Sequence, residues 1–145
     1  MAMEKIVKSI PELEAFAQSF INSFVPRKEG ATLVCLKGDL GAGKTAFTKA
    51  AGKALGVMEH ITSPTFVLMK RFMIHESGFR NLIHIDAYRL EKGEQLKKLG
   101  WEQLLSDPGN LILLEWPERV FDILPPDALT LNFEFIDEQT RKIYY

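Results

Sequence analysis

The sequence predicts an α/β fold in which helices cover both faces of a mixed, mostly parallel central sheet. Short apolar runs of strand length, such as 31–36, 82–85 and 111–114, alternate with segments of helical periodicity. A glycine-rich turn joins the first of these runs to a helix. The chain has 145 residues, of which 46% are hydrophobic and 26% charged, as in an ordinary globular domain. We therefore expect one three-layer α/β domain over residues 1–145.

The first half of the chain is predicted to contain a helix, a strand and a second helix. Residues 9–12 read Ser-Ile-Pro-Glu, a capping box with proline in the first turn of a helix. Apolar residues then recur at helical spacing, and they are Leu13, Phe16, Ala17, Phe20, Ile21 and Phe24. The apolar run 31–36 suits a strand buried on both faces. A helix from about 44 to 55 follows, and Gly56 caps its end.

The second half is predicted to be richer in strands. Its segments, in chain order, are a loop at 62–65, a strand-like stretch at 66–74, a strand at 82–85, a helical stretch at 94–105 interrupted by Gly100, a strand at 111–114, a loop framed by Pro117 and Pro125, a half-buried strand at 129–135 and a final strand at 141–145. We expect the last two strands to pair with each other.

Composition and charge exclude several classes of protein. One cysteine, Cys35, cannot build a disulfide framework or a structural zinc site within the chain. The longest apolar runs are far shorter than the ~20 residues of a membrane helix, and no secretory signal precedes them. A cytoplasmic protein is therefore expected. The net charge of −1, from 18 basic and 19 acidic residues, disfavours direct tight binding to nucleic acid.

A phosphate-binding loop is the most specific motif in the chain. It fits the pattern G-x-x-x-x-G-K-[ST], and its residues are Gly38, Asp39, Leu40, Gly41, Ala42, Gly43, Lys44 and Thr45. The glycines let successive backbone N–H groups point at phosphate oxygens, beside the positive end of the following helix. Lys44 then reaches the β and γ phosphates, and the Thr45 hydroxyl ligates Mg²⁺. The sequence therefore predicts a three-layer P-loop fold that binds a nucleoside triphosphate with Mg²⁺.

Two carboxylates follow apolar strands, and both are candidates for the metal and the attacking water. Asp86 comes after 82–85 and Glu115 comes after 111–114. Because ligands bind at the carboxyl ends of parallel strands, we expect both acids to converge on the phosphate loop. The alternative for each is a helix cap or an exposed turn acid. The pattern does not divide the roles of metal ligand and water positioning between them.

Other residues carry weaker signals. Thr65, in the Ser-Pro-Thr loop, is a candidate switch residue near the γ phosphate, but the same tripeptide is ordinary turn chemistry. His84 is interpreted as a strand histidine with satisfied hydrogen bonds. Trp116 is equally suited to core packing, to stacking on a base or to anchoring a partner.

Four sequence blocks together resemble the bacterial TsaE (YjeE) family, ATPases of tRNA threonylcarbamoyladenosine biosynthesis. They are the phosphate loop at 38–45, Ser-Pro-Thr-Phe at 63–66, His-Ile-Asp-Ala-Tyr-Arg-Leu at 84–90 and Glu-Trp-Pro-Glu at 115–118. They occur in the family's order and extend over most of the chain, which makes the combination far more specific than any block alone.

The resemblance implies a small P-loop ATPase with ATP/ADP and Mg²⁺ as ligands. It implies partners, the threonylcarbamoyl transferase TsaD and its paralogue TsaB, which modify adenosine 37 of tRNAs that read ANN codons. tRNA would be contacted only indirectly, through this complex. By block matching, Lys44 holds phosphate, Thr45 and Glu115 ligate Mg²⁺, and Asp86 acts near the γ phosphate. Thr65 belongs to the switch-like loop.

Three other functions remain as alternatives. A small-molecule kinase would use the same loop, although no insertion is long enough for a separate lid or acceptor domain. A GTPase would need an Asn-Lys-x-Asp run to read the base, and the sequence has none. A nucleotide-binding adaptor that never hydrolyses ATP would carry the same phosphate loop and would differ only in turnover.

Overall fold

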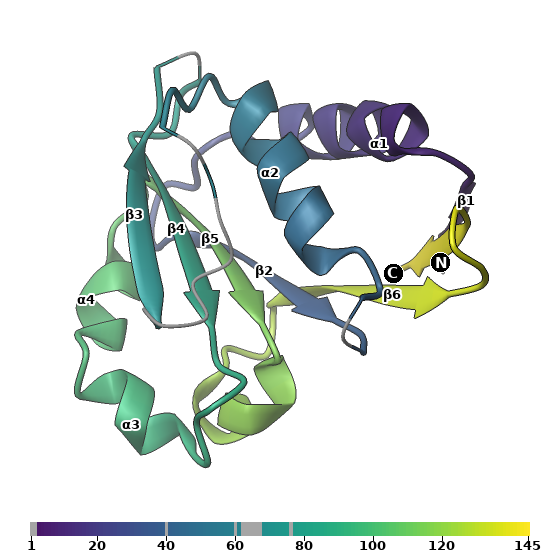
Figure 1. Ribbon diagram of the computed structural model, residues 1–145. Helices are drawn as coiled ribbons and strands as arrows, with labels where there is room; N and C mark the ends of the chain where they lie inside the picture. Colours follow the sequence, from purple (N-terminus) through teal and green to yellow (C-terminus); the bar gives the residue numbers. More distant parts are fainter. Residues whose placement is uncertain (1–2, 40, 60, 62–67, 76) are drawn as a thin grey trace.

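A computed structural model describes residues 3–39, 41–59, 61, 68–75 and 77–145 (Figure 1). In these residues the elements, in chain order, are β1 (Glu4–Val7), α1 (Ile10–Asn22), β2 (Thr32–Lys37), α2 (Lys44–Ala54), β3 (Met69–Met73), β4 (Asn81–Asp86), α3 (Gly93–Lys97), α4 (Trp101–Ser106), β5 (Asn110–Glu115), the 3₁₀ helix η1 (Pro117–Ile123), β6 (Leu129–Phe135) and β7 (Arg141–Tyr144).

The strands form one mixed sheet in the order β1-β7-β6-β2-β5-β4-β3. The four central strands, β6, β2, β5 and β4, are parallel, while β3 and β7 each run antiparallel to their neighbours. Since β1 is antiparallel to β7, five of the seven strands point the same way. The predicted mixed, mostly parallel sheet is confirmed, as is the pairing of the last two strands.

Helices α1 and α2 cover one face of the sheet, as Figure 1 shows. The Ser9 hydroxyl caps α1 by accepting a hydrogen bond from the backbone N–H of Glu12 at 3.2 Å. The buried stripe of α1 packs on α2 through stacked and edge-on aromatic rings, with Phe20 and Phe47 centroids 6.1 Å apart. This packing fixes α2, and with it the phosphate loop, over the centre of the sheet.

The short helices α3, α4 and η1 cover the opposite face (Figure 1). Gly100 separates α3 from α4 with φ of +90°, a left-handed conformation that few residues other than glycine adopt. Trp101 and Leu96 are buried there against residues of β2, β4 and β5. The predicted helical stretch with a break at Gly100 is therefore confirmed.

Two elements differ from the prediction. Strand β1 was not expected, because only Val7 of its four residues is buried and the segment has no clear alternation. It is held by its ladder to β7, and the backbone of Met3 pairs with that of Tyr145 at both N–H groups. The loop expected after Pro117 contains η1, which is stabilised by the burial of Pro117 and Val120. Within the described residues, no helix has the length and apolarity needed to cross a membrane.

Candidate functional site

The carboxyl ends of three parallel strands meet at one edge of the sheet. Glu115, the last residue of β5, is in register with Leu36 of β2 on one side and with Asp86 of β4 on the other. The phosphate loop leaves β2 one residue further on. Hydrogen bonds tie these ends together, from the Trp116 N–H to the Leu36 carbonyl and from the Ala87 N–H to the Glu115 carbonyl. The predicted convergence of Asp86 and Glu115 is what the structure shows.

The loop itself has the backbone shape that its glycines predict. Gly41 and Gly43 have φ of +80° and +109°, in the left-handed region. A Cβ at Gly38 would lie 2.6 Å from the Phe133 carbonyl oxygen, so only glycine fits there. Gly43 caps α2 without a side chain, and the Ala42 N–H bonds to the Asp39 carbonyl. Leu40 lies outside the described residues. The uncapped start of α2 presents its first N–H groups toward the pocket.

Lys44 begins α2 and is only 4% exposed. Its ammonium donates a hydrogen bond to the Gly38 carbonyl, and it lies 3.8 Å from the centre of the Trp116 ring. Burial lowers the pKa of Lys44, against the opposing attraction of Glu115 and Asp86. A desolvated ammonium beside a row of N–H donors is suited to a ligand with several negative charges.

Asp86 ends β4 at the rim of the same pocket. One oxygen accepts a hydrogen bond from the Tyr88 N–H at 3.0 Å. Burial, with a smaller contribution from the negative charge of Glu115, raises the pKa of Asp86 above the ordinary value for an aspartate. The ionised form of Asp86 is thus less favourable than it is in water, and a cation or a hydrogen-bond donor in the pocket would stabilise it.

Glu115 is buried and paired with a histidine. Its Oε2 lies 2.6 Å from Nε2 of His84, and the two side chains are 5% and 0% exposed. His84 was expected to be a satisfied strand histidine, but its Nδ1 has no hydrogen-bond partner within the described part of the chain. The residue that does form a hydrogen bond with His84 is Glu115, one of the predicted site residues.

These groups line one pocket of about 480 Å³, which we call the phosphate pocket after the phosphate loop beside it. Its lining residues are Gly41, Gly43, Lys44, Thr45, Ala46, Asp86, Tyr88, Arg89, Glu115, Trp116 and Arg141. The cationic and N–H donors fit a polyphosphate chain. The oxygens of Thr45, Asp86 and Glu115 are hard ligands of the kind Mg²⁺ prefers. Within the described residues no three acidic, histidine or cysteine side chains form a cluster that could hold a metal by themselves. The donor set thus fits a Mg²⁺ ion that takes most of its ligands from phosphate and water.

Sequence reasoning missed Arg141 of β7, which no motif marks. Its guanidinium donates to the carbonyls of Asp137 and Thr140 and lies 4.5 Å from the centre of the Phe135 ring. Its Nε is buried and has no hydrogen-bond partner among the residues that the structure describes. Arg141 lines the phosphate pocket and also an adjoining one of about 420 Å³, between the start of α1 and the β6–β7 turn. Only the pairing of β7 with β6 brings it there.

Trp116 and Tyr88 form an aromatic wall beside Lys44. Their ring centres are 5.0 Å apart, and the guanidinium of Arg119 lies 5.5 Å from the Tyr88 ring centre. Trp116 has φ of +60°, an uncommon conformation for a large side chain, at the point where the chain leaves β5. Of the uses considered for Trp116, core packing is only partial, since the ring lines the pocket. Thr65 lies outside the described residues, so its predicted switch role remains a prediction.

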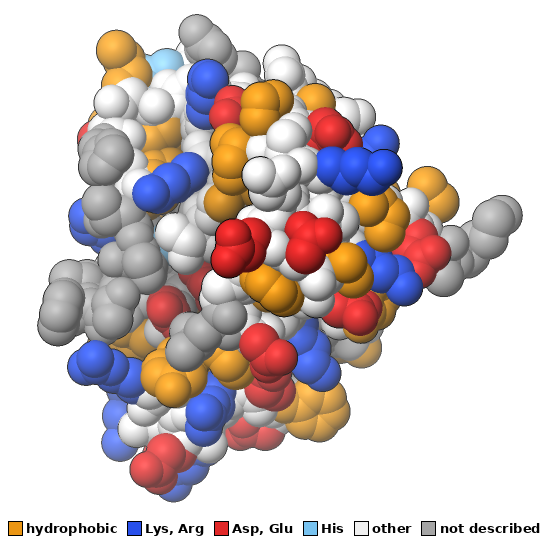
Figure 2. Space-filling model, turned by 45° about the vertical axis from the view of Figure 1, so that its right-hand side comes forward, with side chains coloured by type: hydrophobic (Ala, Val, Ile, Leu, Met, Phe, Trp, Pro, Cys, Tyr) orange, Lys and Arg blue, Asp and Glu red, His pale blue; other side chains and the backbone are white. Residues whose placement is uncertain are grey.

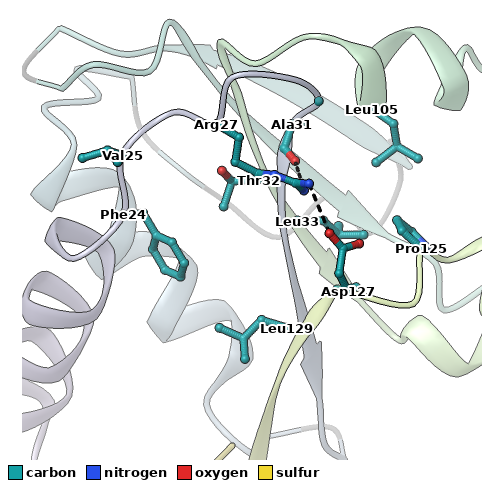
Figure 3. A pocket seen from close by; sticks show the side chains of 12 residues that line it. Phe24, Val25, Arg27, Ala31, Thr32, Leu33, Leu105, Pro125, Asp127 and Leu129 are labelled. Carbon is teal, nitrogen blue, oxygen red and sulfur yellow. Dashed lines mark hydrogen bonds and ion pairs between the residues drawn. The ribbon is translucent and has the colours of Figure 1, made fainter.

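A further pocket lies at the opposite end of the sheet and contains none of the predicted site residues. Figure 3 shows Arg27 reaching across the amino ends of β2 and β6 to Asp127 at 3.1 Å and to the Ala31 carbonyl at 3.3 Å. Its walls are largely apolar, from Phe24, Leu105 and Leu129 among others. The predicted site residues that the structure describes lie instead at the carboxyl edge of the sheet.

Comparison with known proteins points to one family. The family model described as "Threonylcarbamoyl adenosine biosynthesis protein TsaE" matches residues 7–143. The tRNA threonylcarbamoyladenosine biosynthesis protein TsaE of Rickettsia typhi is 36% identical over 136 residues, covering 93% of this chain and 88% of the relative. The Bacillus subtilis protein of the same name is 33% identical over 113 residues, covering 78% and 68%.

The fold is also found in a solved structure. The crystal structure of YdiB from Bacillus subtilis superposes with a TM-score of 0.76, covering 99% of this chain and 84% of that one. At 24% sequence identity this likeness supports the fold: a three-layer α/β domain with the phosphate loop at the centre of its sheet.

Proposed function

The chain belongs to the TsaE family of threonylcarbamoyl adenosine biosynthesis proteins, and we propose that it is the P-loop ATPase of this tRNA modification. It binds ATP with Mg²⁺, hydrolyses it in the cytoplasm and supports the complex that forms N6-threonylcarbamoyladenosine at position 37 of tRNAs that read ANN codons. One observation carries the ATPase proposal. A single pocket holds the buried ammonium of Lys44, the start of α2 and two carboxylates from adjacent strand ends.

The side chains divide the chemistry among them. Lys44 and the N–H groups of the loop bind the β and γ phosphates and stabilise the charge that develops in phosphoryl transfer. Thr45 and Glu115 would hold Mg²⁺, which supplies neutralisation of phosphate charge when bound. Asp86, whose pKa is raised by burial and by Glu115, would accept a hydrogen bond from the attacking water. The ring of Trp116 lines the same pocket, with its centre 3.8 Å from the Lys44 ammonium.

The adjoining pocket is the proposed location of the nucleoside. It shares Gly43, Ala46 and Arg141 with the phosphate pocket, so a nucleotide can extend from one to the other without a break. Arg141 lies between the two and would contact the ribose or the α phosphate. The walls of the adjoining pocket include Val7, Ile10 and Pro11, which offer apolar contact to a base.

The hydrolysis energy is proposed to change a contact with TsaD and TsaB. The family name connects the protein to a modification that requires a transferase, and the described residues form one sheet with its covering helices and no separate acceptor domain. Acidic and basic side chains are interspersed on the face shown in Figure 2. This arrangement and the net charge of −1 support indirect rather than direct contact with tRNA.

The test is phosphate release from ATP, measured with and without the purified transferase pair and tRNA, beside Lys44→Ala as the inactive control. Release that depends on Lys44 and on Mg²⁺ supports the proposal. Formation of ADP and a phosphorylated small-molecule acceptor, with no release of free phosphate, would favour the kinase alternative. Nucleotide binding with no release under any condition would favour the adaptor.

The coupling to partners has its own measurement. A switch that works by binding strength needs about 1–3 kcal/mol of coupling, or a 5- to 150-fold difference in partner affinity. Calorimetry with ADP, with a non-hydrolysable ATP analogue and without nucleotide measures that difference. Asp86→Ala should bind ATP but lose the distinction between ATP and ADP. Equal affinities in all three states of the parent protein would leave a purely kinetic role for hydrolysis.

A further inference from the structure

His84 and Glu115 form a buried polar pair behind the phosphate pocket. They lie on adjacent parallel strands, His84 two residues before the end of β4 and Glu115 at the end of β5. The distance from Nε2 to Oε2 is 2.6 Å, and His84 is completely buried. On either side of His84 in β4, Ile83 and Ile85 are apolar and buried as well. The histidine is thus a polar exception in an apolar strand.

The proton in this contact belongs to the histidine when Glu115 is ionised. A carboxylate can only accept, so the imidazole donates through its Nε2–H. The other ring nitrogen, Nδ1, has no hydrogen-bond partner among the described residues. One carboxylate oxygen is therefore occupied by His84. The other oxygen, Oε1, makes no hydrogen bond to any described residue, and Glu115 lines the pocket.

The site contains opposite charges that form no ion pair with one another in the described part of the chain. Glu115 and Asp86 both attract the Lys44 ammonium, yet in the described part of the chain neither comes within ion-pair distance of it. Lys44 donates instead to the Gly38 carbonyl. A glutamate with three free torsions loses conformational entropy when it is ordered. A hydrogen bond from a rigid, buried imidazole orders it in advance and holds it away from Lys44.

A histidine at this position has a cost that an apolar residue would avoid. Its buried Nδ1 has no hydrogen-bond partner among the described residues, and a buried polar group without a partner destabilises a fold. A leucine or isoleucine, as at the neighbouring positions, would pack the same strand without that cost. The histidine is explained by what it does to Glu115.

We propose that His84 is a positioning residue: it anchors one oxygen of Glu115 so that the other faces the metal side of the phosphate pocket. This inference rests on the proposed function, since it assigns to Glu115 the Mg²⁺ that accompanies the nucleotide. Its role is to orient the carboxylate, with no contact of its own to nucleotide or metal.

The experiment is calorimetric titration with ADP, in Mg²⁺ and in EDTA, of the parent protein and of His84→Leu, His84→Gln and Glu115→Gln. Glutamine places an N–H donor near the position of Nε2, whereas leucine fills the space without a donor. In His84→Leu the tightening of ADP binding by Mg²⁺ should fall by about 10- to 100-fold, the usual effect of losing a partner of a metal ligand. Binding of ADP in EDTA should stay near the parent value. His84→Gln should regain most of the Mg²⁺ effect.

A double-mutant comparison separates positioning from simple packing. If His84 acts only through Glu115, His84→Leu should change the Mg²⁺ effect no further in a Glu115→Gln background. A full, additive loss in that background would overturn the proposal, and so would a His84→Leu variant with the parent's Mg²⁺ effect. Should His84→Leu not fold, His84→Asn replaces it, because its amide is too short to reach Glu115. Equal Mg²⁺ effects in the asparagine and glutamine variants would also overturn the proposal.

ADP binding by the parent protein distinguishes a failure of the proposed nucleotide function from a failure of the proposed role of His84. A parent that binds no ADP in either buffer would refute the nucleotide function and the role of His84 with it. A parent with strong Mg²⁺-dependent binding beside an unaffected His84→Leu refutes the role of His84 alone.

Discussion

Replacing Lys44 with methionine should separate ligand binding from fold stability. Methionine keeps an apolar stem of similar length in the space that the buried lysine fills, but it removes the ammonium. The hydrogen bond to the Gly38 carbonyl and the contact with the Trp116 ring are both lost. Gly38 is half-buried, so water can replace the lost donor. We expect the unliganded variant to be at least as stable as the parent at pH 7.

The reason is the direction of the pKa shift. Burial lowers the pKa of Lys44 in the folded protein, so the charged form is less favourable there than in the unfolded chain. Between the lowered value and the ordinary 10.5, the unfolded chain binds the proton more strongly, and the parent gains stability as pH rises through that window. The methionine variant has no such gain. Its advantage over the parent should therefore be largest near pH 7 and shrink toward pH 10.

Ligand binding should change in the opposite direction. A hydrogen bond to a charged group contributes about 1.5–3 kcal/mol, so losing it weakens nucleotide affinity by roughly 10- to 150-fold. At an ADP concentration of 100 times the parent Kd, the ligand stabilises the parent by about 2.7 kcal/mol. The same concentration stabilises the variant by only about 0.3–1.4 kcal/mol. With about 2–4 °C per kcal/mol, the parent's Tm should rise by roughly 5–10 °C and the variant's by about 1–5 °C.

Thermal unfolding with and without Mg-ADP, at pH 7 and pH 10, measures all of these quantities. If the unliganded variant's free energy of unfolding is more than about 1 kcal/mol below the parent's, Lys44 stabilises the fold and the reasoning above is refuted. An unchanged ADP-dependent rise in Tm would remove Lys44 from the phosphate site.

Three further changes test the surrounding residues. Glu115→Gln keeps the shape and removes the charge, so hydrolysis should fall at least about tenfold and require more Mg²⁺; parent-like rates across a Mg²⁺ titration would make Glu115 merely structural. Asp86→Asn should be more stable than the parent at pH 7, because the raised pKa means that ionised Asp86 destabilises the fold. That advantage should disappear below about pH 4, where Asp86 is protonated in both the folded and the unfolded chain. Urea unfolding at pH 7 and below pH 4 measures the difference in stability between variant and parent, and an equal difference at both pH values would contradict the prediction. Arg141→Ala should weaken ADP binding by about 5- to 30-fold in calorimetry, while Lys142→Ala, next along β7 and paired with Glu4, should leave it unchanged; similar effects of the two would argue against a nucleotide contact.

The phosphate loop could be predicted from the sequence because all of its parts are neighbours in the chain. A buried strand, three glycines and a lysine at fixed spacing specify a local backbone shape that needs no distant contact. The two acids were predicted less directly. Each stands at the end of an apolar run, and the parallel order of β2, β5 and β4 then places both beside the loop. That step needed a general rule about sheets in addition to the pattern.

Other parts of the site could not be predicted from a local signal. Arg141 reaches the pocket only because β7 pairs with β6, and β1 exists only because it pairs with β7. Neither strand has a burial pattern that identifies its neighbour. The partner of His84 is likewise 31 positions away in the chain.

The sequence by itself determined the features that depend on residue type and short-range spacing: the capped first helix, the buried strands, the phosphate loop and the candidate acids. The tertiary structure alone decided which oxygen of Glu115 is bound by His84, that Lys44 lies against the Trp116 ring and forms no ion pair with a described residue, and that Arg141 stands between two pockets. Strand order and side-chain burial set these relations, and both arise from many weak contacts between distant residues. A local sequence pattern specifies the groups a site contains, whereas their distances, partners and pKa values come from packing the whole chain.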